Sequence, residues 1–309
     1  MSEAGNSAPG LIGIGAVFID DIVLPDGRTY MAQLGGGVVH ALLGAVVWDE
    51  RPGIVAVVGE NLPDEAQIRL DRYFDTTGVH RLSIPQARAW QLIEEDGRRR
   101  ELYRVDDIAP FVAGGQPEYF PAFYDASRAF YLLQGFEGIR AWRERLVGMI
   151  LWEPLQQIMT AENRKRFRST LRACPVDLVS PNLIEAQAIY GDRPASDLVT
   201  MMLEDGARIV ALRMGEAGSI VASRDDDERH FIEAIRVPKA IDPTGAGNTY
   251  CGSLLLGLMR GKDLCEAGVM ATVAASFCVE QPGALKPEAI DKAERDRRVE
   301  QLLATKKCL

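Results

Sequence analysis

Apolar runs rich in β-branched residues alternate with amphipathic stretches along most of the chain. Four apolar runs are expected to form strands: 11–19, 53–59, 177–181 and 208–214. Four amphipathic stretches between them are expected to form helices: 38–48, 64–74, 162–173 and 197–206. This alternation is typical of a parallel sheet that is covered by helices on both faces, so the sequence predicts an α/β protein.

Two segments break the alternation, and both lie in the first half of the chain. Each contains an Asp-Gly pair, Asp26-Gly27 or Asp96-Gly97, flanked by extended-looking sequence near 20–35 and 86–106. Asp-Gly is a strong signal for a two-residue hairpin. The two hairpins are expected to pair into a small antiparallel lid over the edge of the main sheet. The alternative is two unrelated surface hairpins, which the sequence does not exclude.

The last third of the chain carries clear helix boundaries. Asp263 is expected to cap a helix that starts at Leu264, and Pro282-Gly283 is expected to end it. The charged segment 287–303 predicts a surface helix. A length of 309 residues fits one large domain with a small appendage.

Composition narrows the classes of protein. A hydrophobic share of 47% and a charged share of 26% are those of a globular chain. A net charge of −9 argues against a nucleic-acid partner, because such proteins present a basic face. The five cysteines form no CxxC pair, which favours reduced thiols in a cytoplasm. We see neither a signal peptide nor a membrane-spanning run, and expect no membrane partner.

The most informative stretch is DPTGAGNTYCG at 242–252, a glycine turn that opens an apolar helix. Gly245, Ala246 and Gly247 allow successive backbone N–H groups to point at one spot, and the helix adds the positive end of its dipole. Such a turn can bind an anion and stabilise the oxygens of a phosphoryl group in transfer. The alternative is a glycine-rich helix start that binds nothing.

This stretch resembles the C-terminal signature D-x-x-G-A-G-D of the ribokinase, or PfkB, family, and further similarities follow in the family's order along nearly the whole chain. The resemblance implies a three-layer α/β/α sheet with a β lid. It also implies ATP, Mg²⁺ and the phosphorylation of sugars, nucleosides or similar alcohols.

The N-terminal third is similar to the substrate side of that family. Asp20 ends a strand-like segment at the position where the family binds substrate hydroxyls, and a carboxylate can accept both hydrogen bonds of a diol. The triplet Gly35, Gly36 and Gly37 is similar to the glycines that let a sugar approach the backbone. His40 and Asn61 depart from the family, which often has Asn and Asp at these positions, so the resemblance leaves the substrate open.

The second half is similar to the nucleotide side. Asn182 and Glu185 match an N-x-x-E element that orders Mg²⁺ and its waters, although an Asn that caps a helix explains them almost as well. Gly215 and Gly218 resemble the family's nucleotide-side G-x-x-G, and without that context they form an ordinary hairpin turn. Residues 274–279 with Gly283 are similar to the segment that lines the adenine pocket.

One departure concerns the chemistry directly. The family places its catalytic Asp at the last position of G-A-G-D, where this chain has Asn248. An amide does not accept a hydroxyl proton at neutral pH, and general base catalysis is worth about 10²–10⁴-fold. Asp242 matches the position that the family uses to support a monovalent cation, so we do not expect it to act as the base.

The sequence therefore predicts an ATP-dependent phosphotransferase of the sugar and nucleoside kinase type, slowed by Asn248. The alternative is a catalytically silent relative that binds the same ligands in a regulatory or assembly role. A dehydrogenase is disfavoured because the run Gly13-Ile14-Gly15 lacks a third glycine at position 18, which is Phe. The exposed edges of the lid could pair in a homodimer.

Overall fold

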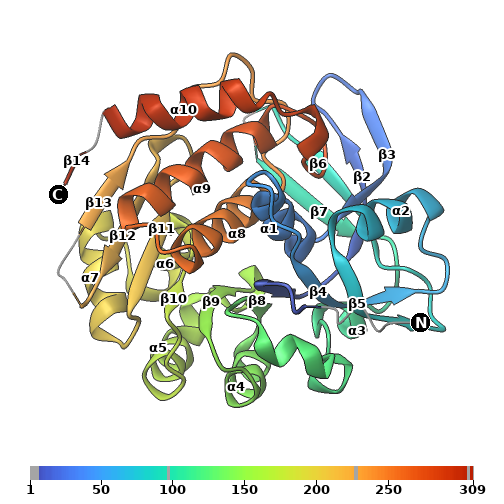
Figure 1. Ribbon diagram of the computed structural model, residues 1–309, viewed down its shortest axis with the longest axis horizontal. Coiled ribbons are helices and arrows are strands. Elements are labelled where there is room, and N and C mark those ends of the chain that lie inside the picture. The colour runs from blue at the N-terminus through green and yellow to red at the C-terminus, as the bar shows by residue number, and fades with distance from the viewer. Residues whose placement is uncertain (1–6, 96–97, 226–228, 305–306, 309) are drawn as a thin grey trace.

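The computed structural model describes residues 7–95, 98–225, 229–304 and 307–308, among which ten strands form the larger of two sheets (Figure 1). In chain order these strands are β1 (Leu11–Ile14), β4 (Gly53–Gly59), β5 (Asp75–Leu82), β8 (Ala129–Gln134), β9 (Met149–Pro154), β10 (Leu178–Val179), β11 (Ile209–Arg213), β12 (Ser219–Ser223), β13 (Arg229–Ile232) and β14 (Lys307–Cys308). Their order across the sheet is β14-β13-β12-β11-β10-β9-β8-β1-β4-β5.

The sheet is parallel from β5 to β11 and antiparallel from β11 to β14. Parallel strands need crossover connections, which the helices supply, and they are buried on both faces. Every residue of β4 is buried, for example, which explains its uninterrupted apolar sequence. The predicted α/β class, with helices on both faces of a largely parallel sheet, is confirmed.

The helices form two layers that pack on opposite faces through two separate hydrophobic cores. One core contains residues from α1 (Gly37–Val46), α2 (Asp64–Tyr73), α8 (Ala246–Met259), α9 (Leu264–Val279) and α10 (Lys292–Ala304). The other contains residues from α4 (Phe136–Arg145), α5 (Arg164–Ala173), α6 (Leu183–Tyr190) and α7 (Ala195–Glu204).

The strand expected at 11–19 is instead two strands, β1 and β2 (Phe18–Val23), which belong to different sheets. The Gly15 N–H still donates to Val55 O of the large sheet at 3.2 Å, whereas the Ile19 N–H donates to Ala87 O at 2.9 Å. The sequence hides this change of sheet because residues on both sides of it are buried and apolar.

The smaller sheet, which we call the lid sheet, consists of β2, β3 (Thr29–Gly35), β6 (Arg88–Ile93) and β7 (Arg99–Tyr103) in the order β3-β2-β6-β7. The hairpins β2-β3 and β6-β7 are antiparallel, but β2 joins them by pairing with β6 in parallel, so the expectation of an antiparallel lid is wrong at this pair. Gly27 adopts a φ of 82° in the turn of the first hairpin. The Asp96-Gly97 pair lies outside the described residues.

A buried carboxylate holds the lid sheet together. Asp21 is fully buried, accepts hydrogen bonds from the Arg88 Nε at 2.7 Å and the Ala32 N–H at 2.8 Å, and also forms an ion pair with Arg104. Its neighbour Asp20 points to the other face of the strand, because successive side chains alternate. The two adjacent acids therefore have different surroundings.

The predicted cap of α9 is confirmed, since the Asp263 carboxylate accepts the Glu266 N–H at 2.7 Å. The helix ends at Val279, three residues before Pro282. In the part of the chain that the structure describes, none of the helices combines the length and the apolar character needed to cross a membrane.

Candidate active site

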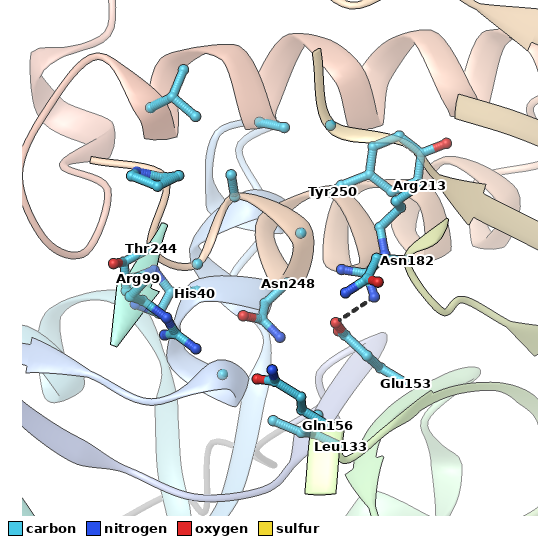
Figure 2. Close-up of a pocket in the computed structure, with 18 of the residues that line it drawn as sticks. His40, Arg99, Leu133, Glu153, Gln156, Asn182, Arg213, Thr244, Asn248 and Tyr250 are labelled. Carbon is cyan, nitrogen blue, oxygen red and sulfur yellow. Dashed lines mark ion pairs between the residues drawn. The ribbon is translucent and has the colours of Figure 1, made fainter. Parts of the chain in front are cut away.

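A cavity of about 1020 Å³ lies where the carboxyl ends of the parallel strands face the lid sheet. Most of the residues singled out in the sequence line it: Asp20, Gly36, Gly37, His40, Asn182, Glu185, Gly215, Gly218, Gly245, Ala246, Gly247 and Asn248. Thr272, Ala275, Ser276 and Val279 of α9 add a further wall. The structure therefore brings segments from both halves of the chain to one cavity, as Figure 2 shows.

The glycine turn forms one end of the cavity, which we call the turn end. Gly245 has a left-handed backbone with φ 76°, and α8 begins at the next residue. A methyl group at position 245 would overlap the His40 ring, so only glycine allows that ring to pack against the turn. The helix N-terminus that follows directs its N–H groups and dipole toward the cavity.

Asp242 and Gly283 support this turn and are not among the described residues that line the cavity. The Asp242 side chain is fully buried and accepts the N–H groups of Thr244 and Gly283, both at 2.9 Å. These hydrogen bonds connect the segment before α8 with the segment that follows α9. Gly35 is likewise absent from the described lining, and a methyl group there would overlap the Asp20 carboxylate.

The lid sheet forms the opposite end, the lid end. Asp20 is 3% exposed, and its Oδ1 accepts a hydrogen bond from the Gln91 Nε2 at 3.0 Å. The same Gln91 Nε2 donates to the Glu101 Oε1 at 2.8 Å. Burial raises the pKa of Asp20 to about 7, more than the Gln91 hydrogen bond lowers it. This carboxylate has no ion-pair partner among the described residues.

His40 lies between the two ends and is 2% exposed. Neither of its ring nitrogens has a hydrogen-bond partner among the described residues. Burial lowers the pKa of His40 to about 4, against the opposing effect of Asp242, so the ring is neutral at physiological pH. A buried imidazole of this kind can donate one hydrogen bond and accept another.

Beneath Asn248 runs a buried chain of hydrogen bonds that sequence analysis missed. The Asn248 Nδ2 donates to the Tyr131 hydroxyl at 3.3 Å, and that hydroxyl donates to the Glu153 Oε2 at 2.6 Å. The Glu153 Oε1 forms an ion pair with the Arg213 Nη2 at 2.9 Å. The signal was present, because Glu153 and Arg213 are charged residues at the ends of otherwise apolar strands.

Asn182 and Glu185 form a reciprocal capping box at the start of α6. The Asn182 Oδ1 accepts the Glu185 N–H at 2.9 Å, and the Glu185 Oε2 accepts the Asn182 N–H at 2.8 Å. Burial raises the pKa of Glu185, and the Arg213 guanidinium 4.0 Å away opposes this rise. The box therefore has a structural role, and both side chains also face the cavity.

The oxygen donors here suit a hard cation only in part. Among the described residues no group of three or more His, Cys, Asp or Glu side chains could hold a metal ion. Mg²⁺ needs no such cage, since it commonly binds through one or two carboxylates, waters and phosphates. The Glu185 carboxylate at the turn end fits that sparse mode.

Two other residues from the sequence have mainly structural contacts. Asn61 accepts the Gln86 N–H at 2.6 Å and is not among the described residues that line the cavity. Gly218 has φ 99°, and a methyl group there would overlap Ile232 O, so the turn between β11 and β12 requires glycine.

Comparisons with known proteins agree with this geometry. Residues 156–290 match the family model described as pfkB family carbohydrate kinase. A cytidine kinase from Thermococcus kodakarensis is 29% identical over 265 residues, which cover 83% of this chain and 91% of the relative.

Two solved structures share the fold. The adenosine kinase from Sinorhizobium meliloti superposes with a TM-score of 0.77 at 19% identity, over 94% of this chain and 99% of its own. A putative ribokinase II from E. coli, in complex with ATP and Mg²⁺, gives a TM-score of 0.76 at 16% identity, over 95% and 99% of the two chains.

Proposed function

Since this chain belongs to the pfkB family of carbohydrate kinases, we propose that it transfers the γ-phosphoryl group of ATP to a hydroxyl of a sugar or nucleoside. The observation that supports this most directly is the shared cavity, with an anion-binding turn at one end and the buried Asp20 carboxylate at the other. ATP is the proposed phosphoryl donor for two reasons: the E. coli structure contains ATP, and the glycine turn suits a phosphate group.

In the proposed reaction, the substrate hydroxyl oxygen forms a bond to the γ-phosphorus. The bond between that phosphorus and the β,γ-bridging oxygen breaks, and ADP leaves with the electron pair. The N–H groups at Gly245–Gly247 stabilise the negative charge of the transferred group. Because the Asn248 amide does not accept a proton at neutral pH, the hydroxyl proton leaves late, onto a phosphoryl oxygen.

Glu185 and Asn182 would hold a Mg²⁺ ion through water at the turn end. When bound, the ion would neutralise charge on the phosphates. Asp20, with Gln91 as its hydrogen-bond donor, would accept bonds from two neighbouring substrate hydroxyls.

The lid end favours a nucleoside over a free sugar. The rings of Phe18 and Tyr103 lie 6.0 Å apart, and both line the cavity with the apolar Val112. Such a wall suits the flat, wholly apolar face of a base better than a free sugar, whose ring carries a hydroxyl on nearly every carbon. The Gln156 and Gln157 amides on the same cavity could meet the polar edge of that base.

The test is an assay with ATP and Mg²⁺ over cytidine, uridine, inosine, adenosine, ribose and fructose, with products identified by mass spectrometry. We expect a nucleoside monophosphate. Product from a free sugar alone would overturn the nucleoside assignment. Failure to bind ATP at millimolar concentration in calorimetry would overturn the kinase function itself.

A second candidate function rests on Asn248. If the proton transfer that the family's Asp supplies is essential, the same cavity serves a ligand-binding protein with a regulatory or assembly role. This candidate predicts ATP and nucleoside binding without ADP release, so the same assay and the calorimetry together distinguish it from the kinase.

A further inference from the structure

The orientation of the Asn248 carboxamide follows from the hydrogen bonds beneath it. Tyr131 is fully buried, and its hydroxyl donates its single proton to the Glu153 Oε2 at 2.6 Å. Glu153 forms an ion pair with Arg213, and a carboxylate in such a pair offers only acceptors. Toward its other neighbour, the Asn248 side chain at 3.3 Å, the Tyr131 oxygen can therefore only accept a hydrogen bond.

Only one end of a carboxamide can donate to this oxygen. The Nδ2 of Asn248 carries two N–H donors, whereas its Oδ1 is an acceptor and would be repelled by a second acceptor. The Nδ2 is also the enclosed end, since a methyl group at Gly37 would lie 3.1 Å from it. The Oδ1 is left to the cavity that Asn248 lines. Figure 2 shows the oxygen of Asn248 on the side of His40 and its nitrogen on the side of Glu153.

The Tyr131 hydroxyl keeps its proton at every physiological pH. Burial raises the pKa of this hydroxyl well above its usual value, and the negative charge of Glu153 raises it further. The direction of the hydrogen bonds, and with it the orientation of the amide, is therefore constant.

We propose that Tyr131, held by Glu153, is a positioning residue that fixes the Asn248 Oδ1 as the hydrogen-bond acceptor for the hydroxyl that attacks phosphorus. The inference rests on the proposed function and deepens it. In this arrangement Asn248 does not take the proton. Its oxygen aligns the hydroxyl so that a lone pair faces the γ-phosphorus, and the proton stays in place until it passes to a phosphoryl oxygen.

The position of Asp20 indicates which hydroxyl this is. Asp20 would accept hydrogen bonds from two neighbouring hydroxyls, and a ribonucleoside has one such pair, on C2′ and C3′. The remaining hydroxyl, on C5′, is then the one left for Asn248, which lines the same cavity. A ribonucleoside and its 5′-deoxy analogue therefore differ only in the group that Asn248 would contact.

The alternative is that the bond between Tyr131 and Glu153 only joins β8 to β9. Tyr131→Phe breaks that bond in either case, but a structural defect would weaken a nucleoside and its 5′-deoxy analogue alike. The matched control is Tyr124→Phe. Tyr124 is also fully buried, its hydroxyl donates to the Asp75 Oδ1 at 2.6 Å, and it lies outside the described lining of the cavity.

Calorimetry measures the affinity of wild type, Tyr131→Phe, Asn248→Ala and the double variant for cytidine, adenosine and inosine, each against its 5′-deoxy analogue. Because one neutral hydrogen bond is at stake, we expect Tyr131→Phe to weaken nucleoside binding about 3- to 10-fold and to leave the 5′-deoxy analogues unaffected. In the Asn248→Ala background the same substitution should change neither ligand. Tyr124→Phe should bind both as the wild type does, and thermal melting establishes that the variants are folded.

The outcomes separate the inference from the proposed function. Three results overturn the inference and leave the kinase function standing: a wild type that binds a nucleoside and its 5′-deoxy analogue equally, a folded Tyr131→Phe that distinguishes them as the wild type does, and equal losses in the wild-type and Asn248→Ala backgrounds. A wild type that binds none of the three nucleosides overturns the nucleoside assignment and the inference together.

Should Tyr131→Phe fail to fold, hydrogen exchange of the Asn248 side-chain NH₂ group in the wild type decides, measured by NMR on the ligand-free protein. We expect slow exchange, because this group donates to the buried Tyr131 oxygen. Fast exchange would show that the NH₂ group faces the cavity, and would overturn the inference.

Discussion

The two ends of the cavity differ in how their buried charges are compensated. At the turn end the Arg213 guanidinium is 2.9 Å from the Glu153 carboxylate, which also accepts the Tyr131 hydroxyl. At the lid end Asp20 has a single amide donor, Gln91, and no ion-pair partner among the described residues. The scaffold thus neutralises its own charges where we propose that phosphate binds, and leaves them uncompensated where we propose that the substrate binds.

This difference follows from where the residues are attached. The turn end is built on strand ends of the large sheet and the start of α8, which pack through the large hydrophobic cores. The lid end is built on a four-stranded sheet whose own apolar cluster contains few residues. An uncompensated polar group such as Asp20 reduces stability, and a ligand that satisfies it recovers that stability. We infer that substrate binding stabilises the lid end more than the turn end.

The largest expected effect comes from adding a charge at the turn end. Asn248→Asp should raise kcat about 10²–10⁴-fold with a true substrate, because a carboxylate can accept the hydroxyl proton. The Tyr131 proton is already donated to Glu153, so the new carboxylate should turn toward the cavity. The N-terminus of α8 lowers its pKa, which makes the lower part of the range the expected one.

The measurement is steady-state turnover of wild type, Asn248→Asp and Asn248→Ala with the same nucleoside. The Ala variant controls for loss of the amide and should show no gain. A wild-type chain that already works at about 1–100 s⁻¹, with Asn248→Asp no faster, would contradict the role given to this residue.

The next effect concerns Asp20 and the dependence of stability on pH. Folded Asp20 has a pKa of about 7 against 3.8 in a model peptide, so between these values the folded state binds the extra proton. Its contribution to the free energy of unfolding therefore falls as pH rises through this window, by about 4 kcal/mol in all. Asp20→Asn removes this loss and should be more stable than the wild type at pH 8 but not at pH 4.

Urea unfolding of wild type and Asp20→Asn at pH 4, 6 and 8 checks this expectation. The difference between the two proteins should grow with pH, and a constant difference across the series would show that Asp20 is not a buried, uncompensated acid.

His40 should change the free energy of unfolding with pH in the opposite direction, by a slightly smaller amount. Its pKa falls from 6.5 to about 4 on folding, so between these values the unfolded chain binds the extra proton. Its contribution to the free energy of unfolding therefore rises by about 3 kcal/mol as pH rises through the window. In the wild type this rise offsets much of the fall caused by Asp20.

In the His40→Gln variant, the fall in unfolding free energy that Asp20 causes with rising pH is no longer offset by His40. We expect the free energy of unfolding of the wild type, taken relative to that of this variant, to rise by about 3 kcal/mol from pH 4 to pH 7. Parallel pH profiles of wild type and His40→Gln would refute the assignment of a buried neutral imidazole.

The sequence predicted the fold well where the signal is local. The strand at 53–59, the helix at 64–74 and the Asp263 cap each follow from consecutive residues, and the structure has β4, α2 and the cap at these places. The glycine turn and the Asn182–Glu185 box are also local patterns. Their roles in binding stay predictions, although both face the cavity.

The sequence failed where contacts join distant segments. Tyr131, Glu153 and Arg213 lie on β8, β9 and β11, and no spacing along the chain relates them. The change of sheet after Gly15 is hidden for a different reason, since the apolar residues on both sides of it are buried in different sheets. Pairing across a sheet is decided by topology, which local periodicity does not encode.

The smallest expected effect is the difference between two glycine substitutions, which tests whether contact with His40, or only the left-handed backbone, requires glycine in the turn. Gly245 and Gly261 have nearly equal φ angles, 76° and 78°. A methyl group at Gly245 would overlap the His40 ring, whereas one at Gly261 would meet nothing within 4 Å. Gly261→Ala should therefore cost only the strain of a left-handed residue, about 1 kcal/mol of unfolding free energy, and Gly245→Ala about 1–3 kcal/mol more.

Gly245→Ala should also weaken ATP binding, because displacement of the ring distorts the N–H groups of the turn, and Gly261→Ala should leave ATP binding unchanged. Urea unfolding and calorimetry on the two variants provide the comparison, and equal losses of stability with equal ATP affinities would show that contact with His40 does not determine the geometry of the turn.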